Sequence, residues 1–135
     1  MALNVSSQFF RFILVGSLAA VVHSVVVFCT EFAVPQLHLN VSNLVGFSMS
    51  FPISFYGQRK FTFKSEAKEA GEIWRFLATQ IFGFFINSVV VFILIYVSGQ
   101  ENSFFVLIGI AVAVVNVFLL SKFWTFRTRS EPDII

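Results

Sequence analysis

Four long apolar segments, separated by shorter polar connections, dominate the pattern of the chain. They cover residues 12–30, 39–56, 76–97 and 104–121. Each has about the 20 residues that a helix needs to cross the hydrocarbon layer of a bilayer. Because backbone groups in lipid must hydrogen-bond to one another, segments of this length predict helices. The pattern therefore predicts an all-α integral membrane protein with four transmembrane helices.

Composition strengthens this prediction and limits what else the chain can contain. Of its 135 residues, 57% are hydrophobic and only 12% are charged, and the mean hydropathy is +0.85. Such values are far from those of soluble domains. Because four spans use most of the length, we expect a single domain over residues 1–135, with no soluble catalytic domain.

The basic residues predict the orientation of the four spans. All nine lysines and arginines lie before the first span, in a charged loop over residues 58–75, or after the fourth span. The connections at residues 31–38 and 98–103 contain none of them. By the positive-inside rule, both termini and the charged loop are predicted to be cytoplasmic, in the inner membrane.

The sequence also repeats itself. His23 to Phe28 matches Asn87 to Phe92, and Arg59-Lys60-Phe61-Thr62-Phe63 falls on Lys122-Phe123-Trp124-Thr125-Phe126. The repeats run from about residue 11 to 64 and from about 75 to 127, and each predicts a hairpin of two helices. Both hairpins begin and end on the same side, so the pattern predicts a parallel repeat, in which transporters commonly place their site between the two copies.

Recognisable catalytic chemistry is missing from the sequence. Cys29 is the single cysteine, and there is no glycine-rich nucleotide loop, metal-ligand cluster or carboxylate pair. We therefore expect no enzymatic activity, no cofactor, no metal and no nucleic-acid partner. Residues 65–75 predict a short interfacial helix leading into the third span.

Small residues recur at every fourth position of the first two spans, which indicates faces where neighbouring helices approach closely. These rows are Gly16, Ala20 and Ser24 in the first span, and Ser42, Gly46, Ser50 and Ser54 in the second.

His23 and Asn87 occupy equivalent positions of the repeat, near the middle of their spans. Polar groups at this depth are costly unless they face protein or water. They either hydrogen-bond across helices or line a path for a hydrophilic head group. Gln80 and Asn116 are further polar residues within the third and fourth spans.

Each hairpin ends on cations followed by aromatic residues and a threonine. A cation at a helix C-terminus is favoured by the helix dipole. It either orients the span or holds a lipid phosphate, with aromatic residues anchoring at head-group depth.

These hairpin endings, together with four spans and the opening Arg11-Phe12-Ile13-Leu14-Val15-Gly16, resemble the GtrA-like family. The resemblance covers about residues 10–127. It implies movement of polyprenyl-phosphate-linked sugars, typically undecaprenyl-phosphate glucose, to the outer leaflet for modification of surface polysaccharide. The chain departs from the family pattern at Gln58 and Ser121, where asparagine is common, and at His23, where an acidic residue is common.

The resulting hypothesis is a flippase for a polyprenyl-phosphate monosaccharide. The lipid phosphate would be bound by Arg59, Lys60, Lys122 and Arg127, with Arg11 and Arg75. The sugar would pass a polar path of His23, Asn87, Asn116, Gln58, Gln80 and Ser121. Because four helices enclose little volume, a lateral groove or a homo-oligomeric interface is expected rather than a closed channel.

Two alternatives remain. The chain could be a membrane anchor or regulatory subunit for a polyprenyl-phosphate glycosyltransferase, as similar four-helix modules are fused to such enzymes. A small multidrug exporter also has four spans, but it normally uses a carboxylate within the first span. Here Glu31 lies at the outer end, so this alternative ranks last.

Overall fold

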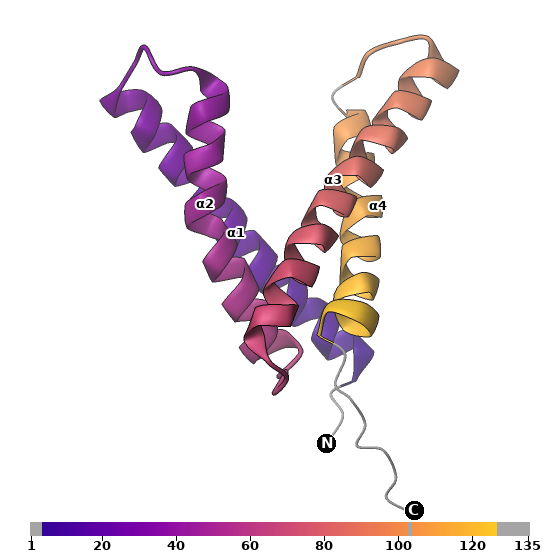
Figure 1. Ribbon diagram of the computed structural model, residues 1–135. Coiled ribbons are helices and arrows are strands. Elements are labelled where there is room, and N and C mark those ends of the chain that lie inside the picture. Colours follow the sequence, from indigo (N-terminus) through magenta and orange to yellow (C-terminus); the bar gives the residue numbers. More distant parts are fainter. Residues whose placement is uncertain (1–3, 103, 127–135) are drawn as a thin grey trace, which may run out of the picture. The chain divides into compact units, whose positions relative to one another are not determined.

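The computed structural model describes residues 4–102 and 104–126, and within them every element is helical (Figure 1). The elements, in chain order, are α1 (Val5–Ala33), α2 (Leu39–Gly57), the π-helical turn η1 (Gln58–Thr62), α3 (Glu69–Ser98), α4 (Phe104–Leu120) and the π-helical turn η2 (Ser121–Thr125).

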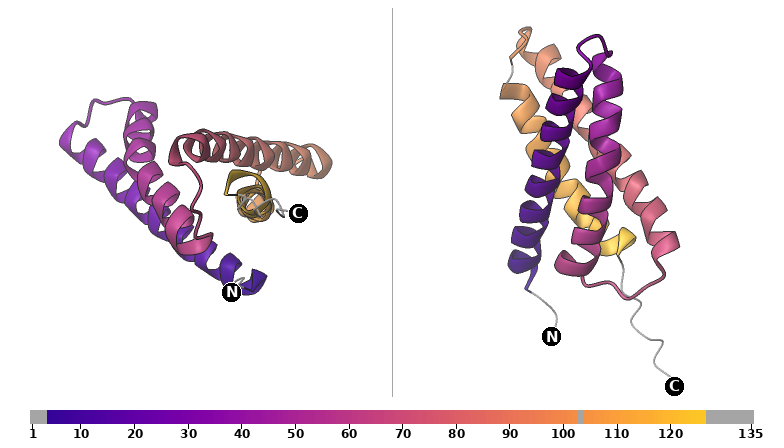
Figure 2. Two further views of the ribbon diagram at one scale, coloured as in Figure 1. Left: turned by 60° about the horizontal axis from the view of Figure 1, so that its bottom comes forward. Right: turned by 90° about the vertical axis from the view of Figure 1, so that its left-hand side faces the viewer.

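The chain divides into two compact units, Met1–Lys64 and Ser65–Ile135. Each unit is a hairpin, in which α1 packs along α2 and α3 packs along α4 (Figure 2). The boundary follows directly after the end of the first sequence repeat. A single four-helix domain stays a prediction.

Three helices are long and apolar enough to cross a membrane: Val5–Ala33, Glu69–Ser98 and Phe104–Thr125. The protein is therefore an all-helical membrane protein with several apolar helices. The helix α2 is not among the three, and its 19 residues include four serines and two asparagines. Four spans and cytoplasmic termini stay predictions.

Local hydrogen bonds and one glycine explain where helices begin and end within each hairpin. At the start of α2, the Nδ1 atom of His38 accepts a hydrogen bond from the Asn40 N–H (3.3 Å). Gly99 ends α3 with a positive φ of 69°, a conformation that glycine adopts without steric cost. The Oδ1 atom of Asn102 then accepts from the Phe104 N–H (3.0 Å) at the start of α4. These contacts satisfy backbone groups that a helix terminus leaves free.

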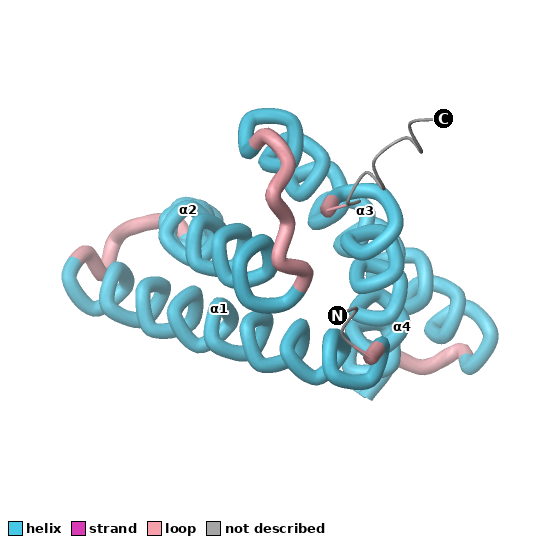
Figure 3. Tube along the Cα trace, turned by 90° about the horizontal axis from the view of Figure 1, so that it is seen from below, coloured by secondary structure: helices cyan, strands magenta, loops and turns pink. Residues whose placement is uncertain are grey.

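The charged stretch over residues 58–75 is more helical than predicted, and the helix predicted over residues 65–75 begins at Glu69 and is part of the third long helix. Residues 58–62 form η1, and residues 69–75 are the first turns of α3, which continues without a break. The remaining connection is a short loop, drawn in pink in Figure 3. The helix begins before the apolar segment because Glu69 and Glu72 in its first turn stabilise the helix N-terminus, where the helix dipole is positive.

The row of small residues in α2 faces the core of the first hairpin, as predicted, with Ser42, Gly46 and Ser50 buried. The prediction for the Gly16 row of α1 is wrong. A Cβ at Gly16 would meet no atom within 4 Å, and the buried face of α1 is instead Phe12, Val15 and Ala19. At Gly46 the missing side chain leaves room for Val27 and His23 of the facing helix.

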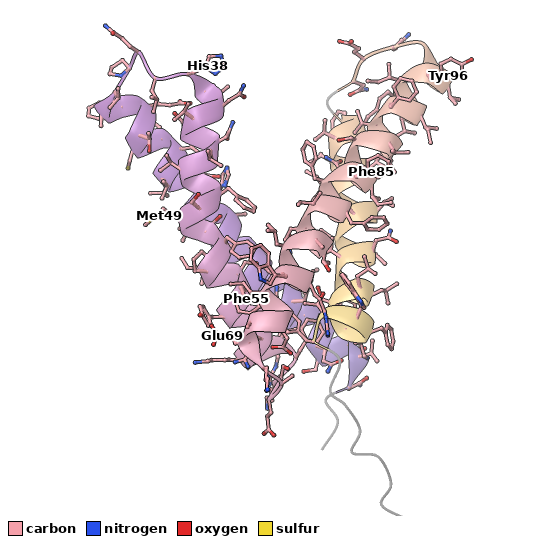
Figure 4. The ribbon with its side chains drawn as sticks, in the orientation of Figure 1. His38, Met49, Phe55, Glu69, Phe85 and Tyr96 are labelled. Atoms are coloured by element: carbon pink, nitrogen blue, oxygen red, sulfur yellow. The ribbon has the colours of Figure 1, made fainter. Side chains whose placement is uncertain are left out.

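The outer faces of the hairpins are strongly apolar. Phe85 is 59% exposed and Tyr96 is 81% exposed, and both project from α3 in Figure 4. Large exposed apolar side chains over most of a helix are expected where lipid, rather than water, is the solvent.

A glycine lies at a close approach of the two helices in both hairpins. A Cβ at Gly46 would lie 2.7 Å from the Val27 Cγ2 atom and 3.0 Å from the His23 carbonyl oxygen. A Cβ at Gly109 would lie 3.1 Å from the Val91 Cγ2 atom and 3.0 Å from the Asn87 carbonyl oxygen. The two hairpins therefore use the same contact at matching positions of the repeat.

We expect Gly46→Val to destabilise the first hairpin by about 1–3 kcal/mol, the usual cost of overpacking, because the obstructing carbonyl is backbone and cannot rotate away. The measurement is thermal unfolding of the purified protein in detergent. Gly16→Val is the matched control, since a side chain there meets open space. Equal losses of stability in the two variants would contradict this account of the contact.

Candidate functional site

The two π-helical turns coincide with the basic and aromatic endings of the two repeats. In η1 the Phe63 N–H donates to the Gln58 carbonyl (2.9 Å), and in η2 the Phe126 N–H donates to the Ser121 carbonyl (2.9 Å). These bonds span five residues rather than four. Such turns are rare and occur frequently at functional sites. We call each turn, together with the start of the helix that it contacts, the basic end of its hairpin. The first basic end is η1 with the start of α1, and the second is η2 with the start of α3.

The same aromatic pair closes both basic ends. The ring centroids of Phe12 and Phe63 are 6.4 Å apart in an edge-to-face arrangement. Those of Phe76 and Phe126, the equivalent residues, are 5.7 Å apart and tilted by 45°. All four side chains are buried. Each π-helical turn is therefore fixed to the first helix of its own hairpin by aromatic packing.

A polar connection lies beside this pair in the first hairpin. The Thr62 hydroxyl donates to the Gln58 Oε1 atom (2.5 Å), and the Gln58 Nε2 atom donates to the Phe12 carbonyl (3.1 Å). Gln58 is 1% exposed and Thr62 is fully buried. The glutamine thus links η1 to the backbone of α1 through both ends of its amide.

The second hairpin forms an equivalent connection with different residues. The Thr79 hydroxyl donates to the Arg75 carbonyl (2.8 Å) and lies 2.8 Å from the Thr125 hydroxyl. Because a hydroxyl has one hydrogen, Thr125 is the donor to Thr79. Ser121, which replaces Gln58 in this repeat, is fully buried, and its Oγ atom has no hydrogen-bond partner in the described part of the chain.

Two cations of the first basic end lie against aromatic rings. The Arg11 guanidinium carbon is 4.7 Å from the Phe61 ring centroid, and its Nη1 atom donates to the Phe61 carbonyl (3.1 Å). The Lys60 Nζ atom is 5.8 Å from the Tyr56 centroid. Cation–π contacts of this kind hold a charge at the protein surface without neutralising it.

Three other predicted phosphate-binding residues differ in their settings. The Lys122 Nζ atom lies 5.5 Å from the Phe123 ring centroid, and Arg59 is half-buried in η1. Arg75 is exposed on α3. Arg127, which we also predicted to bind phosphate, lies outside the described residues. The described cations of each hairpin thus lie at one end of that hairpin. That they bind a phosphate stays a prediction.

His23 and Asn87 lie at the glycine contacts in the middle of the hairpins. The His23 Cε1 atom would be 3.4 Å from a Cβ at Gly46, and the Asn87 Oδ1 atom lies over Gly109. That Oδ1 atom is buried and has no hydrogen-bond partner among the described residues. The sequence allowed a hydrogen bond across the helices as one interpretation of Asn87. Within the described residues, its Oδ1 atom accepts no such bond.

Two further residues of the predicted polar path, Asn116 and Gln80, lie on the helices of the second hairpin. The Asn116 Nδ2 atom donates to the Val112 carbonyl of its own helix (2.9 Å), and Gln80 is half-buried on α3. A polar side chain in an apolar helix commonly bonds its own backbone in this way, which lowers the cost of its polarity. Their role in a path stays a prediction.

Sequence reasoning missed the threonines and one buried carboxylate. Thr62 and Thr125 stand at matching positions of the repeat, and this match was the available signal for a shared role. The buried carboxylate belongs to Glu72, whose Oε1 atom accepts from the Ser65 hydroxyl. Nothing in the spacing of Glu72 distinguishes it from the exposed acids beside it. Over residues 4–102 and 104–126, no three potential metal ligands lie close together.

We expect Gln58→Leu to destabilise the first hairpin by about 1–3 kcal/mol, because it removes the hydrogen bond to the Phe12 carbonyl and leaves the buried Thr62 hydroxyl without its Gln58 acceptor. Thermal unfolding in detergent measures the effect. Ser121→Ala is the matched control at the equivalent position, where the hydroxyl has no partner to lose, and it should leave stability unchanged or raise it. A larger loss for the control would refute the proposed connection.

Comparisons with known proteins identify the class of this domain. The family model described as "GtrA/DPMS, transmembrane domain" matches residues 11–130. Neither the comparison with curated proteins nor the comparison with solved structures finds a match. The matched range includes both glycine contacts and both basic ends. The chain therefore belongs to the GtrA/DPMS transmembrane-domain family, a group of membrane proteins with a role connected to glycosyl lipids.

Proposed function

We propose that this protein moves a polyprenyl-phosphate-linked monosaccharide, such as undecaprenyl-phosphate glucose, from the inner to the outer leaflet of the cytoplasmic membrane. The main support is that the family's glycosyl-lipid role coincides with a repeated basic end on each hairpin. In this proposal all four helices span the membrane, and both termini and the basic ends face the cytoplasm. No chemical bond is made or broken.

The basic ends suit the phosphate of such a lipid. Lys60 and Lys122 each lie against an aromatic ring, so their positions are restricted while their charge stays available. A lipid phosphodiester at head-group depth is attracted by cations and is bound most strongly by charge-assisted hydrogen bonds. We place the entry of the lipid head group at these residues, with Arg59, Arg75 and Arg127 as further cations.

The sugar needs polar partners on its way through an apolar layer. The Asn87 Oδ1 atom is a buried acceptor without a partner among the described residues, and a sugar hydroxyl is a donor that could satisfy it. Leaving such a group unsatisfied costs free energy. In the proposal His23, Asn87, Asn116 and Gln80 contact the sugar in turn while the prenyl chain remains in lipid.

Transport is tested by reconstituting the purified protein into vesicles with a fluorescent polyprenyl-phosphate glucose. Exchange between leaflets, read from the fraction accessible to an external quencher, should be faster than in vesicles without protein. Vesicles containing the Gly46→Val variant serve as a control for a disturbed hairpin. Exchange no faster than in empty vesicles would exclude the flippase.

A second function, an anchor for a membrane glycosyltransferase, is supported by the fact that the matched family is defined by a transmembrane domain. Such an anchor would bind its partner enzyme through its lipid-facing helices and would not need polar residues in mid-membrane. Co-purification with a glycosyltransferase from native membranes would favour it.

The double variant His23→Leu and Asn87→Leu separates the two functions. If the sugar passes these residues, we expect transport to fall at least ten-fold, because each lost polar contact is worth about 1 kcal/mol or more. Leaflet exchange and expression level are the measurements. Val25→Leu with Val89→Leu, at exposed positions of the same two helices, is the control. Unchanged exchange with normal expression would exclude a path past these two residues, whereas co-purification with a glycosyltransferase that survives the double change, without leaflet exchange by the unmodified protein, would favour the anchor.

A further inference from the structure

Equivalent arginines of the two repeats have different surroundings. Arg11 opens the first repeat and Arg75 opens the second, each directly before a buried phenylalanine, Phe12 or Phe76. If the repeats worked in the same way, both arginines would contact the π-helical turn of their own hairpin. Only one of them does so in the described part of the chain.

The side chain of Arg11 is already committed to the protein. Its Nη1 atom donates to the Phe61 carbonyl, and its guanidinium plane lies near the ring of the same residue. Phe61 lies in the last turn of the helical run, where carbonyl groups lack partners within the helix. Arg11 therefore satisfies one of these carbonyls and joins α1 to η1.

The side chain of Arg75 makes no such contact. It is exposed, and within the described residues it has no hydrogen bond, ion pair or ring contact, although its backbone carbonyl accepts from Thr79. Trp124, the counterpart of Phe61, is 46% exposed. The link between Thr79 and Thr125 joins α3 to η2 without using the arginine.

We infer that Arg75 binds the phosphate group of the lipid, whereas Arg11 holds the first π-helical turn in place. A phosphate that approached Arg11 through Nη1 would have to displace the Phe61 carbonyl. Arg75 loses no protein contact on binding, and its guanidinium can meet two phosphate oxygens at once. Trp74, 71% exposed beside it, is a residue type that favours the membrane interface.

This inference rests on the proposed function for the identity of the ligand, but its test does not require transport. Binding of radiolabelled geranylgeranyl phosphate, a lipid monophosphate, is measured on the full chain in detergent micelles. The variants are Arg75→Gln, Arg75→Lys, Arg11→Gln and Arg11→Lys. Lys68→Gln, an exposed cation before α3, controls for the loss of one charge.

We expect Arg75→Gln to weaken binding about ten-fold, as for loss of a charge-assisted hydrogen bond, and to reduce the dependence of affinity on salt. Arg75→Lys should restore part of the affinity, because it keeps the charge. Amide hydrogen exchange of residues 121–126 should not change in either variant, since the side chain contacts nothing there.

Arg11→Gln and Arg11→Lys should both accelerate amide exchange in residues 58–63 by about three- to ten-fold, the effect of one lost hydrogen bond. The salt dependence of lipid binding should stay as in the unmodified protein. Lysine does not rescue Arg11, because its single ammonium cannot bond the carbonyl and stack on the ring together.

Four results would overturn the inference: no binding by the unmodified protein, normal binding by Arg75→Gln, normal exchange in Arg11→Gln, or a flattened salt dependence in Arg11→Gln. Inorganic phosphate at equal concentration should not displace the lipid, and full displacement would mean a site for free phosphate instead. If binding behaves as expected while leaflet exchange is absent, the flippase fails and the assignment of Arg75 stands.

Discussion

Close contact between its two helices is the constraint on which each hairpin depends. Apolar side chains gain nothing by leaving lipid for one another, so helices in a membrane associate through tight packing and polar links. Gly46 and Gly109 allow this packing, with backbone carbonyls of the facing helix near each of them. The register set there places the ends of the helices, and hence the π-helical turns, opposite α1 and α3.

The two basic ends show how one geometry can be maintained by different chemistry. The aromatic pairs are conserved between the repeats, but Gln58 links the first hairpin where Thr79 links the second. Both arrangements connect a buried threonine to a backbone carbonyl of the first helix. This substitution leaves the Ser121 hydroxyl without a partner among the described residues and makes an arginine contact unnecessary in the second hairpin.

The polar residues in the middle of the hairpins also lie at the close contacts between the helices. Asn87 reaches the facing helix only because Gly109 has no side chain, and its oxygen is then buried without a protein donor. A cost of this kind persists where a group serves a purpose other than stability. This is the physical ground for the proposal that these residues contact a lipid head group.

The sequence by itself determined the membrane setting, the four helices and the two hairpins, because apolar length, charge distribution and repeats are properties of the chain. It also located the basic ends. It could not show that residues 58–62 and 121–125 are π-helical, or that the Gly16 row faces outward. Nor could it show that the Arg11 side chain bonds Phe61 while that of Arg75 contacts none of the described residues. Those features depend on which side chains face each other after the helices pack. Only the tertiary structure decides that, because the contacts join residues about 50 positions apart, such as Arg11 and Phe61.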